Sequence, residues 1–80
     1  MRIQVRAFAA LRELLGSAFE LDVPAGSSCG SVCSRLTAQF ATAQSLLDHC
    51  MLAVNGQYAG REVLLGEGDE LALLPPVSGG

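Results

Sequence analysis

The part of this sequence best suited to covalent chemistry is its C-terminal segment, Pro75-Pro76-Val77-Ser78-Gly79-Gly80, called the tail below. Proline fixes φ and lacks an N–H donor, so the proline pair predicts a stiff, extended exit from the preceding element. Gly79 and Gly80 have no Cβ, so no side chain hinders approach to the Gly80 carbonyl. Fully extended, six residues reach about 20 Å. We therefore expect the tail to project and to carry the Gly80 carboxylate into the cleft of another protein.

Acyl chemistry at Gly80 requires activation, because a carboxylate is a poor electrophile. An acyl-adenylate made from ATP is one such activated form. The sequence contains no lysine, and it lacks the glycine-rich loop with lysine that cradles nucleotide phosphates. We therefore expect a partner enzyme to consume the ATP and this chain to bind no cofactor permanently. The alternative interpretation of Gly79-Gly80 is an inert, frayed terminus.

The other reactive residue types do not form a catalytic set. Asp69 and Glu70 are adjacent, which on a strand would point them to opposite faces, so we interpret them as part of a solvated turn. Cys29 and Cys33 have the spacing of a reactive pair at a helix start, where thiol pKa values fall, but their place in an apolar stripe favours small core residues. His49 is the only histidine and has no cysteine or carboxylate at metal-ligand spacing, so no metal site is expected.

Length and composition limit the classes of protein to which this chain can belong. Its 80 residues predict one domain, and 50% hydrophobic residues with only 16% charged residues argue against disorder. The net charge is −3, and the five basic residues are scattered arginines, which argues against nucleic acid as a partner. No apolar run approaches the roughly 20 residues that span a bilayer. Three cysteines, an odd number, favour a reducing compartment, and we expect a cytoplasmic protein.

The elements that must position the tail follow from the periodicity of apolar residues. Alternating or continuous apolar stretches predict strands over residues 2–8, 19–23, 51–54, around Tyr58, and 70–74. Helical spacing predicts helices over residues 9–15, from a cap at Ser27 or Ser28 to Phe40, and a weaker turn over 43–49. Asn55-Gly56 predicts a tight hairpin, and the run over 51–54 is typical of a strand buried on both faces.

This order of elements predicts an α+β fold of the β-grasp, or ubiquitin-like, type: a mixed sheet packed on one main helix. A ferredoxin-like fold is the alternative, but it needs a second full-length helix, and residues 60–68 are too few and too rich in glycine. We therefore expect residues 1–74 to form the domain and residues 75–80 to protrude from it.

Strand parity predicts a partner-binding surface beside the tail. Phe8 shares a face with Arg6, and Leu74 shares a face with Glu70, so both apolar side chains are expected to point away from the core. With Tyr58 they form an exposed apolar cluster, a feature typical of interfaces. The alternative is that a curled sheet edge buries them. Arg12, beside this face, is suited to bind a partner carboxylate bidentately, although a merely solvated arginine is nearly as consistent with the sequence.

Four stretches of the chain resemble the family of molybdopterin synthase small subunits. They are Phe8-Ala9-Ala10-Leu11-Arg12-Glu13-Leu14-Leu15-Gly16, Ala53-Val54-Asn55-Gly56, Gly68-Asp69-Glu70-Leu71 and the tail, which is the most specific. The resemblance implies a β-grasp fold whose terminal glycine, here Gly80, is adenylated by a ubiquitin-activating-type adenylyltransferase. A sulfur donor protein then converts it to a thiocarboxylate. Leu73-Leu74 departs from the aromatic residues that this family often has before the proline pair.

The resemblance also implies the partner and the product. The sulfur passes to a cyclic pterin precursor in the large synthase subunit, whose side chains are expected to supply the catalysis. A heterotetramer and two deliveries per pterin are implied, because a dithiolene holds two sulfurs. Gly79 would give access to the carbonyl, and the tail residues Pro75, Pro76, Val77 and Ser78 would contact the partner.

Three other functions remain open from the sequence. A thiamine-pathway sulfur carrier also ends in Gly-Gly on this fold, but Pro75-Pro76-Val77-Ser78 argues against it. A ubiquitin-like protein modifier would have Gly80 joined to a lysine of a target protein; the absence of lysine here excludes only chains of the modifier itself. The last possibility is an interaction module with an inert tail.

Overall fold

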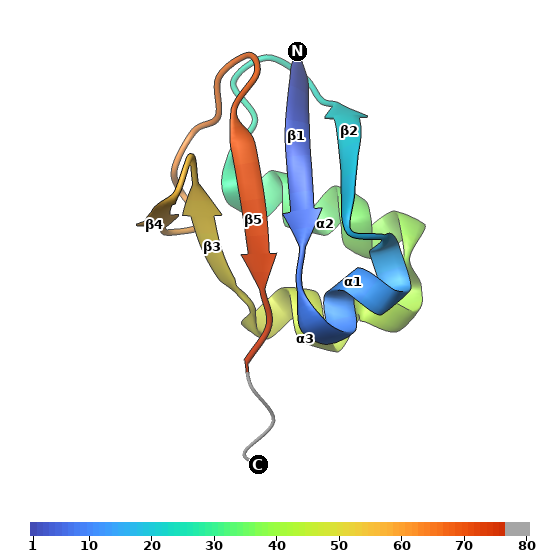
Figure 1. Ribbon diagram of the computed structural model, residues 1–80. Helices are drawn as coiled ribbons and strands as arrows, with labels where there is room; N and C mark the ends of the chain where they lie inside the picture. Colours follow the sequence, from blue (N-terminus) through green and yellow to red (C-terminus); the bar gives the residue numbers. More distant parts are fainter. Residues whose placement is uncertain (77–80) are drawn as a thin grey trace.

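The computed structural model describes residues 1–76, so the predicted site residues Val77, Ser78, Gly79 and Gly80 lie outside the described residues. The elements follow in the order β1 Arg2–Ala7, α1 Ala9–Leu15, β2 Ala18–Asp22, α2 Cys29–Gln39, the 3-10 turn η1 Ala41–Ala43, α3 Gln44–His49, β3 Met51–Val54, β4 Gln57–Ala59 and β5 Glu70–Leu74. This is the predicted order. The strands form one layer, α2 crosses behind it, and α1 and α3 lie at the end where β1 and β5 stop (Figure 1).

The five strands form one mixed sheet in the order β2-β1-β5-β3-β4. The central pair, β1 and β5, is parallel, with Val5 opposite Leu71. The other pairs, β1–β2, β3–β5 and β3–β4, are antiparallel. A parallel pair at the centre, with α2 packed across one face, is the predicted β-grasp arrangement, and that prediction is confirmed.

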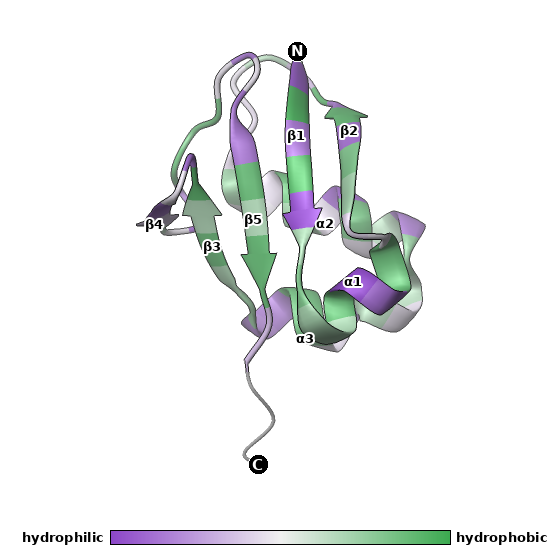
Figure 2. Cartoon of the chain, in the orientation of Figure 1, coloured by the Kyte–Doolittle hydropathy of each residue, from purple (hydrophilic) through white to green (hydrophobic). Residues whose placement is uncertain are grey.

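The core lies between the inner sheet face and the helices. In β1, Ile3, Val5 and Ala7 are buried, whereas the residues between them are exposed, as the alternation predicts. The purple and green bands along β1 show this period of two (Figure 2). From β5, Leu71 and Leu73 join the same core cluster. Because side chains alternate along a strand, the residues between these core residues form the outer face, which no second layer built from residues 1–76 covers (Figure 1).

Helix α2 begins at the predicted cap. Of the two candidate serines, Ser28 is the N-cap, and its side-chain oxygen accepts a hydrogen bond from the Ser31 N–H at 3.1 Å. The core-facing stripe of α2 consists of the buried residues Cys29, Val32, Cys33 and Leu36. Phe40 is half-buried at the C-cap. The predicted stripe is therefore confirmed, and it aligns α2 with the inner sheet face.

The Asn55-Gly56 hairpin is confirmed and has a second role. Asn55 and Gly56 have φ values of 50° and 86°, the left-handed pair that a tight hairpin requires. The side-chain amide nitrogen of Asn55 donates to Asp69 Oδ1 at 3.0 Å, and its amide oxygen accepts from the Glu70 N–H at 3.0 Å. Asp69 also accepts from the Gly66 N–H at 2.7 Å. Asp69 therefore belongs to a turn, as predicted, and ties the hairpin to the start of β5.

The prediction that residues 51–54 are buried on both faces holds only for the middle of the strand. Leu52 and Ala53, which point to opposite faces, are 3% and 7% exposed. Met51, on the outer face at the start of β3, is 56% exposed. A continuous apolar run therefore does not show that every residue in it is covered.

The three cysteines are free and buried, as expected of core residues, and His49 is exposed. Within residues 1–76, no group of three histidine, cysteine, aspartate or glutamate side chains is placed to hold a metal ion. No helix in the same part of the chain has the length and apolar character needed to cross a membrane.

Candidate functional site

The tail leaves the domain from the centre of the sheet. Strand β5, which ends at Leu74, lies between β1 and β3, and Pro75 and Pro76 follow it out of the sheet (Figure 1). Because β1 and β5 are parallel, both strands end at the same edge of the sheet. The Phe8 N–H donates to the Leu73 carbonyl at 3.2 Å, which holds the end of β1 beside the start of the tail. The predicted site residues Phe8, Leu74 and Pro75 are therefore brought together.

Phe8 is fixed by its position between β1 and α1. It has an extended backbone at the N-cap of α1, and its carbonyl accepts from the N–H groups of Leu11 and Arg12 at 3.1 and 3.2 Å. The guanidinium carbon of Arg6 lies 5.5 Å from the ring centroid, within the range of a cation–π contact. Phe8 therefore shares a face with Arg6, as parity predicts, and it is half-buried there.

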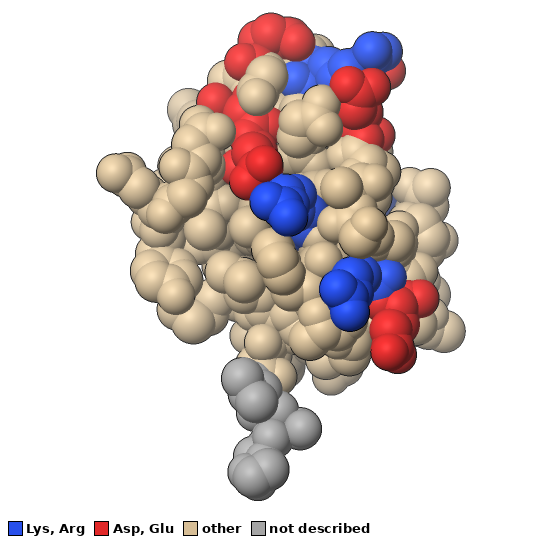
Figure 3. Space-filling model, in the orientation of Figure 1, with Lys and Arg blue, Asp and Glu red and all other residues tan. Residues whose placement is uncertain are grey.

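Cross-strand pairing extends this apolar surface over β3 and β4. Leu74 lies opposite Met51, and Tyr58 lies opposite Ala53, on the outer face. Tyr58 is 75% exposed. Four residues with large apolar side chains thus lie on the outer face, and we call them the apolar patch: Phe8, Met51, Tyr58 and Leu74. Phe8, Met51 and Leu74 lie near the start of the tail, whereas Tyr58 is in register with Ala53 and Ala72, beside the middle of β5. In Figure 3 the side of this face that carries β3 and the end of β5 is largely tan, that is, without charged side chains.

Met51 was missed as a surface residue in the sequence interpretation, although the same parity that assigned Leu74 identifies it once β3 is paired with β5. Met51 and Tyr58 also line an open hollow of about 410 Å³, together with Cys50, Leu52, Ala59, Gly60 and Arg61. The apolar patch therefore includes a concave part that is suited to receive an apolar side chain.

Arg12 lies in the last turn of α1 and is exposed. Its charge interacts favourably with the negative end of the helix dipole. Within residues 1–76 it forms no ion pair. This placement is compatible with both interpretations given from the sequence, a contact with a partner carboxylate and a solvated arginine.

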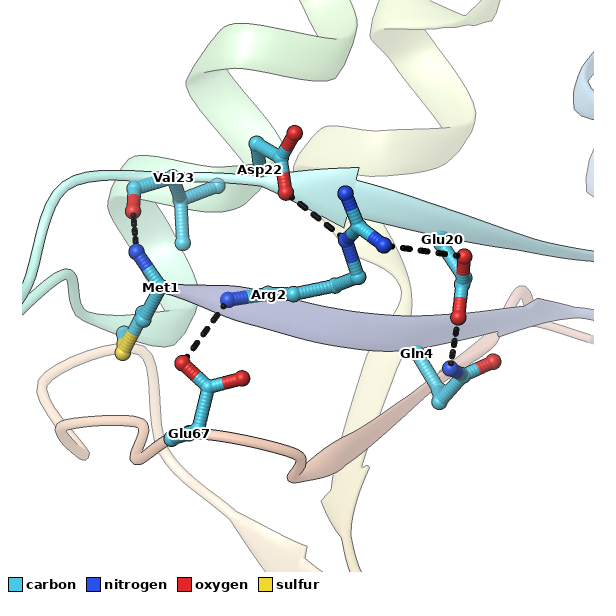
Figure 4. A network of polar contacts seen from close by, with 7 residues as sticks. All are labelled: Met1, Arg2, Gln4, Glu20, Asp22, Val23 and Glu67. Atoms are coloured by element: carbon cyan, nitrogen blue, oxygen red, sulfur yellow. Dashed lines mark hydrogen bonds and ion pairs between the residues drawn. The ribbon is translucent and has the colours of Figure 1, made fainter.

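The other end of the outer face is polar, and its side chains are paired with one another (Figure 4). Arg2 donates to Asp22 at 3.0 Å and lies 3.7 Å from Glu20, which accepts from the Gln4 amide at 2.9 Å. The hydrogen bond and charge of Arg2 lower the pKa of the Asp22 carboxyl. We call these residues the polar cluster: Arg2, Gln4, Glu20 and Asp22. In Figure 3 the blue and red side chains are densest at this end, where β1 and β5 begin, although others lie at the middle and the lower right of the same face.

With this geometry in view, comparison with known proteins identifies the family. The model of the ThiS family matches residues 5–80. This chain belongs to the ThiS family. Its relatives include the molybdopterin synthase sulfur carrier subunits of Arabidopsis thaliana and Mycobacterium tuberculosis, each 33% identical. The alignments cover all of this chain, with 84% of the Arabidopsis protein and 99% of the Mycobacterium protein.

Solved structures of similar proteins confirm the ubiquitin-like fold. SAMP1 from Haloferax volcanii has a TM-score of 0.83 and 32% identity, with both chains covered completely. Subunit 1 of the molybdopterin-converting factor from Helicobacter pylori, solved in a complex with subunit 2, has a TM-score of 0.70. At 23% identity, again with both chains covered completely, this second structure supports the fold alone.

Proposed function

We propose that this ThiS-family chain is the sulfur carrier subunit of a molybdopterin synthase. The observation that carries the proposal is its alignment, over its whole length, with several proteins named as sulfur carrier subunits, at up to 36% identity. The fold agrees with this assignment, because β5 delivers the tail from the centre of the sheet. The function requires nothing more of the domain than to hold the tail and to be recognised by partners.

The proposed chemistry takes place at Gly80. The Gly80 carboxylate attacks the α-phosphorus of ATP on an adenylyltransferase of the ubiquitin-activating type, and pyrophosphate leaves. A sulfur donor protein then supplies a sulfur nucleophile that displaces AMP and leaves a thiocarboxylate. The large synthase subunit binds the cyclic pterin precursor, which takes the sulfur. Two carriers are consumed for each dithiolene, and the glycines keep the carbonyl accessible.

The apolar patch is proposed to bind the large subunit while the tail enters its active site. Tyr58 and Met51 are exposed without a covering layer, although aromatic residues and methionine are typical of the centre of an interface. Arg12 would pair with a carboxylate at the rim of the same interface. The Helicobacter pylori complex shows that a protein of this fold assembles with a second subunit.

Intact mass spectrometry tests the chemical proposal. The chain is incubated with ATP, an adenylyltransferase of this type and a sulfur donor, and its mass is expected to increase by the exchange of one oxygen for sulfur. Fragmentation should locate the change at Gly80, and the sample without ATP serves as the control. Sulfur found as a persulfide on a cysteine, with Gly80 unchanged, would overturn the assignment.

A second function, protein modification, is favoured by one observation. SAMP1 from Haloferax volcanii, which is 32% identical and completely covered, is small archaeal modifier protein 1. In this function Gly80 would form an amide with a lysine of a target protein. Peptides from the host proteome that carry the Gly80 carboxyl on a lysine side chain would support it. Thiocarboxylate formation without such peptides would support the sulfur carrier alone.

A further inference from the structure

Two arginines carry positive charge beside the start of the tail. Arg6 lies opposite Ala72 in the parallel pair of β1 and β5, and its guanidinium carbon lies 5.5 Å from the Phe8 ring centroid. Arg12 lies in the last turn of α1, and its N–H donates to the Phe8 carbonyl at 3.2 Å. Both arginines are exposed. The positive charge near the end of β5 is thus carried by guanidinium groups and by no lysine.

The tail is long enough to return to these two positions. Neighbouring strands lie about 4.8 Å apart and a strand rises about 3.3 Å per residue, so Arg6 lies within about 10 Å of Leu74. Six fully extended residues reach about 20 Å. A lysine amine at either position would therefore come within range of an activated Gly80 carbonyl. A guanidinium stays protonated in proteins and offers no lone pair for such an attack.

The α-amino group of Met1 is held away from the tail. An α-amino group loses its proton at lower pH than a lysine side chain, so it is ordinarily the more reactive amine near neutral pH. Here it donates to the Val23 carbonyl at 2.7 Å, and the Val23 N–H donates back to the Met1 carbonyl at 2.9 Å. It also lies at the start of β1, six strand residues or about 20 Å from the end where β5 stops (Figure 1). This amine is therefore both bound and distant from the start of the tail.

The thiols are withheld by burial. All three are at most 7% exposed: Cys29, Cys33 and Cys50. Cys50 directly precedes Met51, which lies opposite Leu74 beside the start of the tail. Its S–H donates to the Leu47 carbonyl at 3.4 Å, whereas Met51 is 56% exposed. At this place burial, and not position in the fold, separates a thiol from the tail.

The other exposed nucleophiles give no lasting acyl product. The hydroxyl groups of serine, threonine and tyrosine are weak nucleophiles unless a base activates them. His49 is exposed, and its Nδ1 lies 2.9 Å from the Ser45 carbonyl. Because a carbonyl only accepts, Nδ1 carries the hydrogen and Nε2 is the nitrogen left to react. An acylated imidazole is itself an activated acyl group, which passes to water.

We propose that this chain is an acyl donor that cannot acylate itself, because guanidinium groups supply the charge beside the tail while its amine and thiols are bound or buried. The proposal rests on the proposed function, since it requires an activated Gly80. In the reaction that is prevented, an amine attacks the Gly80 carbonyl carbon. A C–N bond forms, the bond to the leaving group breaks, and the leaving group takes up the proton that the amine loses. The acyl group is thereby reserved for an acceptor that a partner supplies.

A thioester of Gly80 tests this without any partner enzyme. The full chain is released from an intein fusion as the Gly80 thioester of mercaptoethanesulfonate and is kept at mildly alkaline pH, and its intact mass is followed. The wild type is expected to hydrolyse to the carboxylate and to form no product lighter than the carboxylate by one water. Failure of an adenylyltransferase to activate Gly80 would contradict the proposed function and would leave this measurement unaffected.

Two lysine variants test the role of the arginines. Arg12→Lys is expected to form an internal amide, one water lighter than the carboxylate, because a nearby amine reacts at a high effective concentration. Arg2→Lys is the matched control. It is the same exchange at the start of β1, where the side chain of Arg2 donates to Asp22 at 3.0 Å. Its internal amide should form slower than that of Arg12→Lys by about tenfold or more.

A third variant tests the burial of the thiols. Met51→Cys places a thiol one residue from Cys50 on the exposed face opposite Leu74, and it should form an internal thioester that hydroxylamine cleaves. Native Cys50 should form none. An internal product in the wild type, equal rates in Arg2→Lys and Arg12→Lys, or no internal product in either Arg12→Lys or Met51→Cys would overturn the proposal.

Discussion

Where β1 and β5 begin, the outer sheet face carries side chains that pair with one another, whereas at the end where these strands stop it carries apolar side chains that nothing covers. Arg2, Glu20 and Asp22 satisfy each other across β1 and β2. Met51, opposite Leu74 at the other end, is 56% exposed, and Tyr58, in register with the middle of β5, is 75% exposed. The two ends belong to one continuous sheet, so the difference arises from the side chains and not from the backbone.

This difference indicates which part of the face a partner would cover under the proposed function. In the polar cluster, hydrogen bonds and ion pairs between side chains replace contacts with water. Because the site is exposed, these pairs contribute little to stability. The apolar patch gains from burial, since apolar surface is stabilised when it leaves water. The tail begins beside the patch and not beside the polar cluster. Docking at the patch would therefore hold the start of the tail against the partner.

The largest expected effect is at Gly80. Deleting Gly80, or adding one residue after it, should reduce pterin conversion to background, because the reacting carbonyl moves by about 3.5 Å per residue. The melting temperature should not change, since every residue of the core cluster precedes the tail. A pterin-conversion assay and a thermal melt measure the two. Full activity of the shortened chain would contradict the assignment of Gly80.

The next largest effect is expected at Leu74, and one pair of variants compares the outer and inner faces of β5. Leu74→Ala removes an apolar side chain from the patch and should weaken binding to the large subunit by about thirtyfold, or about 2 kcal/mol, with little change in melting temperature. Leu73→Ala is the matched control, since Leu73 is 0% exposed in the core. It should lower the free energy of unfolding by about 2–5 kcal/mol.

Calorimetric binding and thermal melts on both variants decide this prediction. Phe8→Ala should behave as Leu74→Ala does, because the backbone hydrogen bonds of Phe8 do not depend on its ring. Equal losses of stability in Leu73→Ala and Leu74→Ala, with unchanged affinity in both, would show that the outer face is not the interface.

A smaller effect is expected for Arg12. Arg12→Gln should weaken binding to the large subunit by about three- to tenfold, as expected for one charged group at the rim of an interface. The loss should shrink as salt is added, because screening weakens the wild-type contact. Gln4→Ala in the polar cluster is the control and should leave the affinity unchanged. Salt-independent losses in Arg12→Gln would contradict a charge contact.

The sequence predicted the elements well where a local rule decides them. The alternation in residues 2–7 identified the buried face of β1, and Asn55-Gly56 identified the hairpin, because each pattern depends on neighbouring residues. Met51 was misassigned because an apolar run does not show whether a second layer lies on the outer face. Phe8 was assigned to the same face as Arg6 because side chains alternate between the two faces of a strand. The structure confirms this assignment.

The position of Arg61 was beyond sequence reasoning for a different reason. Arg61 lies in the loop after β4 and donates to the Leu47 carbonyl of α3, and no regular spacing links these two residues. Their proximity depends on how α3 packs and on the path of the loop. For the cysteines, the sequence indicated an apolar environment, and the structure confirms it.

The smallest effect concerns the ion pair of Arg2 with Asp22. Because Arg2 lowers the folded-state pKa of Asp22, the pair stabilises the fold above the unfolded pKa of an aspartate, near 4. That contribution is lost as the pH falls through the lower, folded-state pKa. Arg2→Gln should therefore melt slightly below the wild type at pH 7 and together with it at strongly acid pH. A difference that grows on acidification would contradict this sign.

A single-turnover transfer assay tests the central claim most directly. Purified thiocarboxylated chain is mixed with the large subunit and the cyclic pterin precursor, and the masses of the chain and the pterin product are followed together. The account predicts that the chain returns to its carboxylate mass while two equivalents are consumed per dithiolene formed. A thiocarboxylate that persists beside the large subunit and the precursor, with no sulfur in the pterin, would contradict it.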